Sequence, residues 1–225
     1  MSNLILPTLR NFLIGAIALG LLLFPAAGTF AYWKAWLFIL VFLTSVSAIG
    51  VYLSLQDPAL LERRKQFGPA AEQSIAQKMI MSLTLIGFLG IFVVSALDQR
   101  YGWSSAPSYV PILGNLLIVL GFLILFFVFK ENSYGSSNIQ VIEEQNIVTT
   151  GPYGLVRHPM YTGTLIMSSG IPLALGSLWG LLVLFLITPI LIWRILEEEK
   201  LLKRELPGYP EYMQKVRKRL IPYVW

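Results

Sequence analysis

The sequence contains no cysteine and only one histidine, His158. Without cysteine, the chain can form no disulfide, use no thiolate nucleophile, and hold neither an iron–sulfur cluster nor a cysteine-ligated zinc ion. A single histidine also excludes a metal site built from several imidazoles. We therefore expect no metal, and any chemistry must come from other kinds of side chain.

Charged residues are also scarce, at 13% of the chain, whereas hydrophobic residues make up 56%. A soluble domain carries roughly a quarter charged residues, and here the apolar residues form long uncharged blocks. The composition therefore predicts a membrane protein with lipid as its surroundings. In such a protein the formal net charge of +5 reflects topology rather than binding to nucleic acid, and we expect no nucleic-acid partner.

Long apolar runs predict the membrane spans. A spanning helix needs roughly 20 mostly apolar residues. Four blocks meet this length: Phe12–Phe30, Trp36–Leu55, Met79–Leu97 and Pro111–Phe129. The first block could also be a signal peptide, but it follows a single arginine and stays apolar past its small residues, which favours a retained helix.

A fifth apolar region, Met160–Trp193, is too long for one helix and is interrupted at Gly170, Pro172 and Gly176. This pattern predicts a tight helical hairpin that turns at residues 175–178 and has a short first arm. The fold class is thus an all-α integral membrane protein with about six transmembrane helices. This topology places both termini on the same side of the membrane, and 15 of the 17 basic residues lie on that side. The positive-inside rule therefore predicts cytoplasmic termini.

Two polar segments flank the hairpin, residues 138–163 and 194–202. Because a hairpin returns the chain to the same side of the membrane, we expect these segments to meet and form a pocket. By contrast, Asp57–Gln77 is expected to lie along the inner membrane surface and is assigned no chemistry. Tyr209 and Tyr212, in a basic tail, are expected to pack a surface helix against the protein.

Arg157-His158-Pro159 has the features of a helix start. A residue before proline is extended, and proline suits the first helical turn. The free N–H groups that follow, with the helix dipole, would attract an anion such as a carboxylate. Gly163 would let another backbone or a ligand approach. His158 could instead be a hydrogen-bonded residue at the membrane surface, and Tyr161 an interfacial anchor, but the neighbouring polar groups favour a site.

The second segment places Arg194 and Glu198 four residues apart on one helix face, with Glu199 about 100° around the helix. These charges could simply be the solvated end of the last helix. However, Arg194 directly follows an apolar run, at a depth where charges are costly and tend to be functional. We therefore favour a functional role for Glu198 and leave Glu199 open between the two interpretations.

These motifs resemble the isoprenylcysteine carboxyl methyltransferase family, which is related to the phospholipid N-methyltransferases. The resemblance is carried by Gly151-Pro152-Tyr153, Arg157-His158-Pro159-x-Tyr161-x-Gly163, Arg194-x-x-x-Glu198-Glu199-x-x-Leu202 and the closing Arg219-Leu-Ile-Pro222, and it covers roughly residues 138–225. It implies an N-terminal membrane region, 1–130, and a catalytic region, 131–225. We expect the protein in a bacterial inner membrane with its active site on the cytoplasmic side.

The resemblance implies an S-adenosylmethionine site unlike the soluble dinucleotide-binding type, and the chain has no Gly-rich strand–loop–helix unit. By this likeness Arg194 would face the acceptor and steer a carboxylate, and Arg194, Glu198 and Glu199 would form the catalytic group. The cofactor contacts would come from Gln140, Gln145, Asn146, Ile147, Val148, Tyr153, Arg157, His158, Pro159, Tyr161 and Glu198.

The methyl acceptor would be lipid-borne or a small hydrophobic molecule. A carboxylate is favoured because it needs no general base. An amine acceptor would need one, for which Glu199 is the candidate, and a thiol or lipid headgroup stays open.

Two other functions are considered. A membrane reductase of the sterol-reductase type would share the C-terminal architecture, but basic residues for a nicotinamide cofactor's 2′-phosphate are sparse beyond Arg157 and Arg194. A transporter or scaffold ranks last, since the spans carry almost no charge.

Overall fold

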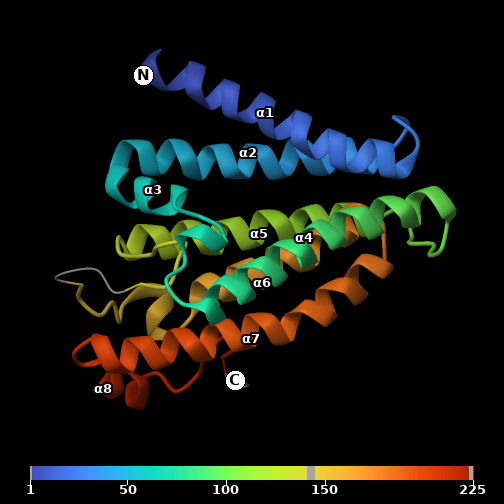
Figure 1. The fold of residues 1–225 in the computed structure, drawn as a ribbon. Helices are drawn as coiled ribbons and strands as arrows, with labels where there is room; N and C mark the ends of the chain where they lie inside the picture. The colour runs from blue at the N-terminus through green and yellow to red at the C-terminus, as the bar shows by residue number, and fades with distance from the viewer. Residues whose placement is uncertain (1, 141–144, 223–224) are drawn as a thin grey trace.

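The computed structural model describes residues 2–140, 145–222 and 225, which form a bundle of long helices with short helices and loops gathered at one end (Figure 1). No strand occurs in this part of the chain, which confirms the all-α prediction. The elements are α1 (Ser2–Ala27), α2 (Trp33–Gln56), α3 (Pro58–Lys65), η1 (Pro69–Ala71), α4 (Ile75–Tyr101), α5 (Val110–Glu131), η2 (Gly151–Gly154), α6 (Pro159–Ala174), α7 (Trp179–Glu205) and α8 (Tyr209–Lys215).

Five helices, α1, α2, α4, α5 and α7, are long and apolar enough to cross a membrane. The sixth, α6, has 16 residues and is about 24 Å long, shorter than the roughly 30 Å hydrocarbon layer. The predicted hairpin with a short first arm is therefore confirmed. The first helix begins at Ser2 instead of Phe12, because a lone arginine at position 10 has good helix propensity and does not end a helix.

Helices α5 and α6 pack with their backbones in contact. Gly114 and Gly121 of α5 face Gly170 and Gly163 of α6, and a methyl group added at Gly170 would lie 2.5 Å from the Gly114 carbonyl oxygen. At Gly163 an added methyl group would lie 3.1 Å from the Gly121 oxygen. Small residues permit such close packing of membrane helices. The prediction that Gly163 admits another backbone is confirmed, and α6 lies closely along α5.

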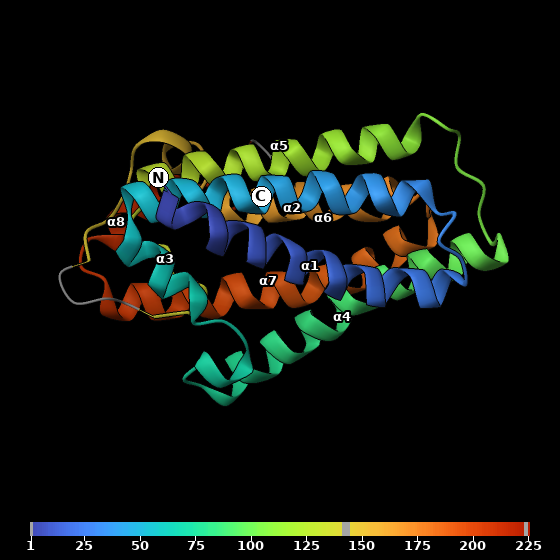
Figure 2. The same ribbon diagram turned by 90° about the horizontal axis from the view of Figure 1, so that it is seen from above.

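The turn between α6 and α7 is held at the opposite end of the bundle. Ser177 donates a hydrogen bond to the buried carboxylate of Asp98 at 2.6 Å, and Ser104 donates to the same side chain. Tyr32 donates to the carbonyl oxygen of Leu175 at 2.7 Å. With its turn fixed in this way, the hairpin returns its two open ends together. In Figure 2 these ends lie with α3 and α8, far from the α4–α5 connection.

Candidate functional site

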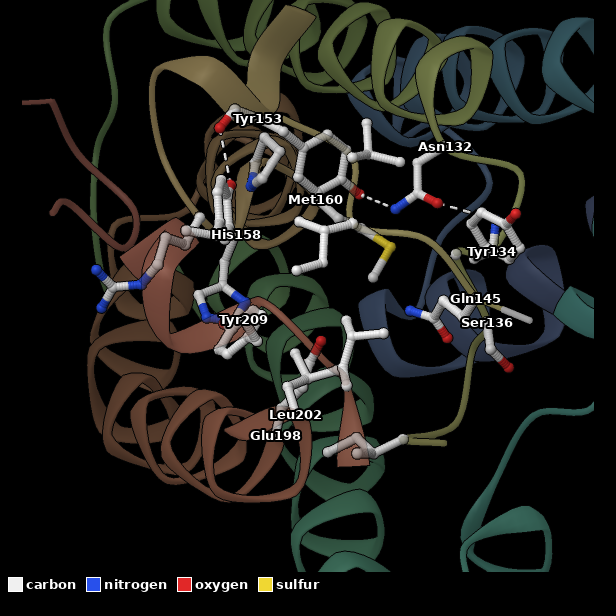
Figure 3. Close-up of a pocket in the computed structure, with 18 of the residues that line it drawn as sticks. Asn132, Tyr134, Ser136, Gln145, Tyr153, His158, Met160, Glu198, Leu202 and Tyr209 are labelled. Atoms are coloured by element: carbon white, nitrogen blue, oxygen red, sulfur yellow. Dashed lines mark hydrogen bonds between the residues drawn. The ribbon is translucent and has the colours of Figure 1, made fainter. Parts of the chain in front are cut away.

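A pocket opens between the loop that follows α5, the polar segment before α6, the start of α6, the last turns of α7, and α8 (Figure 3). The eleven residues expected to contact a cofactor all line it: Gln140, Gln145, Asn146, Ile147, Val148, Tyr153, Arg157, His158, Pro159, Tyr161 and Glu198. The two polar segments around the hairpin therefore do meet in space. Of the predicted catalytic group, only Glu198 is among the lining residues.

The start of α6 forms one wall of the pocket. His158 is non-helical, with φ −123° and ψ 60°, and Pro159 occupies the first helical turn, as predicted. The carbonyl oxygen of His158 accepts the backbone N–H groups of Tyr161 and Thr162, which closes the first turn. Pro159, Met160 and Tyr161 all face the pocket. The positive end of the α6 dipole is thus presented to any ligand there, and it favours a carboxylate or another anion.

Glu199 lies in a buried charge cluster outside the pocket lining and is only 2% exposed. One of its oxygens, Oε1, accepts from Arg157 Nε at 2.8 Å and lies 3.2 Å from His158 Nε2. The other, Oε2, accepts from Arg219 Nε at 3.1 Å. Two guanidinium groups and an imidazole therefore occupy this carboxylate. Its contacts fit a role in holding Arg157 and His158 in place, and they leave it poorly placed to act as a base on a ligand.

The C-terminal tail is tied to the same cluster. Arg157 Nη1 donates to the carbonyl oxygens of Val216 and Arg217 at 2.9 and 2.8 Å. The backbone N–H groups of Arg157 and His158 donate to the next two carbonyl oxygens of the tail. The tail therefore runs beside the start of α6 and closes the back of the pocket wall. Sequence reasoning included Arg219 in the matched motif but did not assign it this role.

A chain of hydrogen bonds links the pocket to a buried ion pair behind it. Tyr161 donates to Glu198 Oε2 at 2.6 Å, and Arg194 Nε donates to the Tyr161 oxygen at 3.1 Å. Arg194 does not line the pocket and is only 7% exposed. Its Nη1 lies 2.9 Å from Glu72 Oε1, and its Nη2 donates to the carbonyl oxygen of Ser137 at 3.0 Å. Arg194 is therefore committed to protein partners rather than to an acceptor.

Glu72 belongs to the segment to which the sequence assigned no chemistry. The one available indication was indirect, since a buried arginine after an apolar run needs an acidic partner somewhere.

Tyrosines form much of the remaining wall. Asn132 donates to the Tyr153 hydroxyl at 2.8 Å, and burial raises the pKa of Tyr153 to about 12, so this phenol stays neutral. Tyr212 donates to the Tyr153 carbonyl oxygen at 2.8 Å, which packs α8 against η2 as expected for the tail helix. Tyr209 also lines the pocket, and its buried hydroxyl has no hydrogen-bond partner within the described residues. Sequence reasoning gave both tail tyrosines structural roles and missed their place in the pocket.

The charges around the pocket favour a ligand with a cationic group. Arg157 and Glu198 are the only lining residues with a permanent charge among those described, and Arg157 is paired with Glu199. Among the described lining residues, the carboxylate of Glu198, held by Tyr161, is thus the one charge left for a ligand to pair with. A zwitterionic ligand would fit, with its cation at Glu198 and its anion at the start of α6.

The chain is similar to a family of membrane enzymes and, over a shorter stretch, to a sterol reductase. Residues 109–207 match the family model described as phospholipid methyltransferase. The matched stretch runs from just before α5 to just after α7, and so contains most of the pocket walls but not α8 or the tail. The match supports a membrane methyltransferase.

A second similarity is to the Delta(14)-sterol reductase of Mus musculus. It is 31% identical over 94 residues, which cover 40% of this chain and 22% of the reductase. Because the chain matches only about a fifth of that protein's length, the similarity fits the reductase alternative only in part.

Proposed function

We propose that this protein is a membrane methyltransferase that uses S-adenosylmethionine to methylate a lipid-borne or small hydrophobic acceptor. The observation that carries the proposal is the convergence of the eleven expected cofactor contacts on one pocket, in which Glu198 is the available charge among the described residues. The methyltransferase family match over residues 109–207 supports it independently.

The pocket's residues suit the cofactor's functional groups. When bound, S-adenosylmethionine supplies a methyl group carried on a positively charged sulfonium. Glu198 would pair with the cofactor's ammonium group, and the positive end of the α6 dipole would receive its carboxylate. The buried hydroxyl of Tyr209 offers a donor or acceptor that has no protein partner in the described structure. These three features give a zwitterionic ligand a defined orientation.

The protein's contribution to transfer would be positioning and exclusion of water. Met160, Leu202 and Leu206 line the pocket beside the tyrosines and reduce its contact with solvent. Holding two reactants in line in such a site can contribute up to about 7–11 kcal/mol. Direct transfer to a nucleophile needs no covalent intermediate on the enzyme. The chain, which has no cysteine, also offers no thiolate for one.

The pocket constrains the class of methyl acceptor less strongly than it constrains the cofactor. A carboxylate acceptor was also expected to be steered by Arg194, but this guanidinium is instead paired with Glu72. An amine acceptor would need a base, and Glu199, named for that role, is occupied by two arginines. Glu198 is the carboxylate that faces the pocket among the described residues. We propose that the pocket and both termini face the cytoplasm of a bacterial cell, because 15 of the 17 basic residues lie on that side of the predicted topology.

A membrane reductase is the second candidate, on the strength of the sterol-reductase similarity. A nicotinamide cofactor with a 2′-phosphate would need cationic side chains in the pocket. Arg157 is the only arginine or lysine among the described lining residues, and its guanidinium is used by Glu199 and by tail carbonyls. The pocket's charges therefore favour the methyltransferase.

Binding of S-adenosylmethionine to the purified full chain, measured by isothermal titration calorimetry, tests the proposal. We expect saturable binding that reduced nicotinamide dinucleotides do not displace. Tight nicotinamide binding without affinity for S-adenosylmethionine would instead establish the reductase. Mass spectrometry of lipid extracts from cells with and without the gene would then identify the acceptor as a product heavier by one methyl group.

A further inference from the structure

Glu72 lies just after η1, in the segment that joins α3 to α4, and its carboxylate is almost fully buried at 3% exposure. Its two oxygens contact two different elements. Oε1 lies 2.9 Å from Arg194 Nη1 on α7, and Oε2 accepts the backbone N–H of Ile139 at 3.2 Å. Ile139 lines the pocket. A buried carboxylate is costly unless it is paired, and both oxygens of Glu72 have partners. Through these contacts Glu72 joins η1 to α7 and to residues 134–140, which we call the pocket loop.

The rest of the same segment fastens the same loop. The side chain of Asn138 donates to the carbonyl oxygen of Ala71 at 3.1 Å, and Ser137 donates to the carbonyl oxygen of Arg64 at 2.9 Å. Arg64 Nη1 in turn donates to the carbonyl oxygen of Gly135 at 3.2 Å. Since Gly135 and Asn138 also line the pocket, the α3–η1 segment supports the pocket loop from outside.

The other side of Glu72 leads to the pocket's carboxylate. Arg194, paired with Glu72, donates to the hydroxyl of Tyr161, and this hydroxyl donates to Glu198. If the charge on Glu72 were removed, the guanidinium of Arg194 would stay buried without its counter-charge. Glu198, which shares the Tyr161 hydroxyl with Arg194, would then attract this guanidinium. A guanidinium pairing with Glu198 would compete with any cationic group of a ligand.

We propose that Glu72 is a positioning residue for the cofactor site. It fixes the pocket loop through Ile139 and commits Arg194 to itself, so that Glu198 stays available to the cation of the ligand. The inference rests on the proposed function, because the pocket it concerns is the proposed S-adenosylmethionine site. It also assigns a role to the N-terminal region in a site otherwise built from the C-terminal half.

The test compares S-adenosylmethionine binding by the full chain in lipid nanodiscs, well below the unfolding temperature. Glu72→Gln is expected to weaken binding tenfold or more. Glu62→Gln, which removes the same charge from the exposed surface of α3, should stay within twofold of the unaltered protein. The double variant Glu72→Leu/Arg194→Met removes both buried charges and should bind at least threefold more tightly than Glu72→Gln, because no unpaired guanidinium is left to compete for Glu198.

A folded Glu72→Gln variant with unchanged affinity would overturn the inference, as would a folded double variant without recovery. Hydrogen–deuterium exchange of the unaltered protein gives a second test that does not depend on any variant folding. Addition of S-adenosylmethionine should slow exchange in residues 69–74 together with residues 134–140, and slowing in the pocket loop alone would contradict the coupling. Absence of binding by the unaltered chain would overturn the proposed function and this inference with it.

Discussion

Three consecutive glutamates on α7 allow one substitution to be made in three surroundings. Glu197 forms a surface pair with Lys200, whose side chain is 70% exposed. Glu198 faces the pocket, and Glu199 lies in the buried cluster with Arg157. Replacement by glutamine removes the same charge from each position and changes the side-chain shape little. We expect only Glu199→Gln to destabilise the fold substantially.

The magnitude follows from the burial of each partner. In Glu199→Gln, the guanidinium of Arg157, with a side chain 4% exposed, loses its counter-charge, and breaking such a buried pair costs about 3–5 kcal/mol. The glutamine oxygen can still accept one hydrogen bond, so the lower end of this range applies. Arg219 is partly exposed, and its loss adds roughly 0–1 kcal/mol, as does the loss of the Glu197 surface pair in the control variant.

Thermal unfolding in detergent, followed by the intrinsic fluorescence of the chain's six tryptophans, measures the difference. A loss of about 3 kcal/mol in a chain of this size lowers Tm by roughly 6–12 °C. Tryptic cleavage in the basic tail should also become faster, because Arg157 holds the tail carbonyls. If Glu199→Gln and Glu197→Gln unfold within about 2 °C of each other, the cluster does not stabilise the fold as argued.

Three further outcomes are expected. Glu198→Gln should weaken S-adenosylmethionine binding at least tenfold in calorimetry while leaving Tm within a few degrees, and unchanged affinity would remove this residue from the site. Gly170→Ala should destabilise the protein by about 1–3 kcal/mol, because its methyl group would lie 2.5 Å from the Gly114 carbonyl oxygen. Gly50→Ala, where nothing lies within 4 Å, should leave Tm unchanged or raise it, and equal losses in both would refute the packing argument. Tyr209→Phe should leave Tm unchanged, since its hydroxyl has no partner in the described structure, and weaken cofactor binding roughly 2–10-fold, as expected for the loss of one hydrogen bond.

The sequence predicted those features that depend on neighbouring residues. Long apolar runs gave the spanning helices, and the breakers around Gly176, whose φ is +75°, gave the hairpin turn. The helix start at His158 and Pro159 followed from the conformational limits of proline. The division into residues 1–130 and 131–225 stays a prediction. Glu72, from the first region, supports a pocket formed by the second.

Tertiary structure alone decided which charges a ligand can reach. Glu198 and Glu199 are adjacent in the sequence, but a helical step of about 100° turns one toward the pocket and the other toward Arg157, His158 and the tail. Glu72 and Arg194 are far apart in the sequence, and no local pattern indicates that they pair. The length of an apolar run and the conformational limits of proline and glycine are properties of short stretches, so they can be read from the sequence. The partners of a buried charge depend on how α6, α7, η1 and the tail pack together.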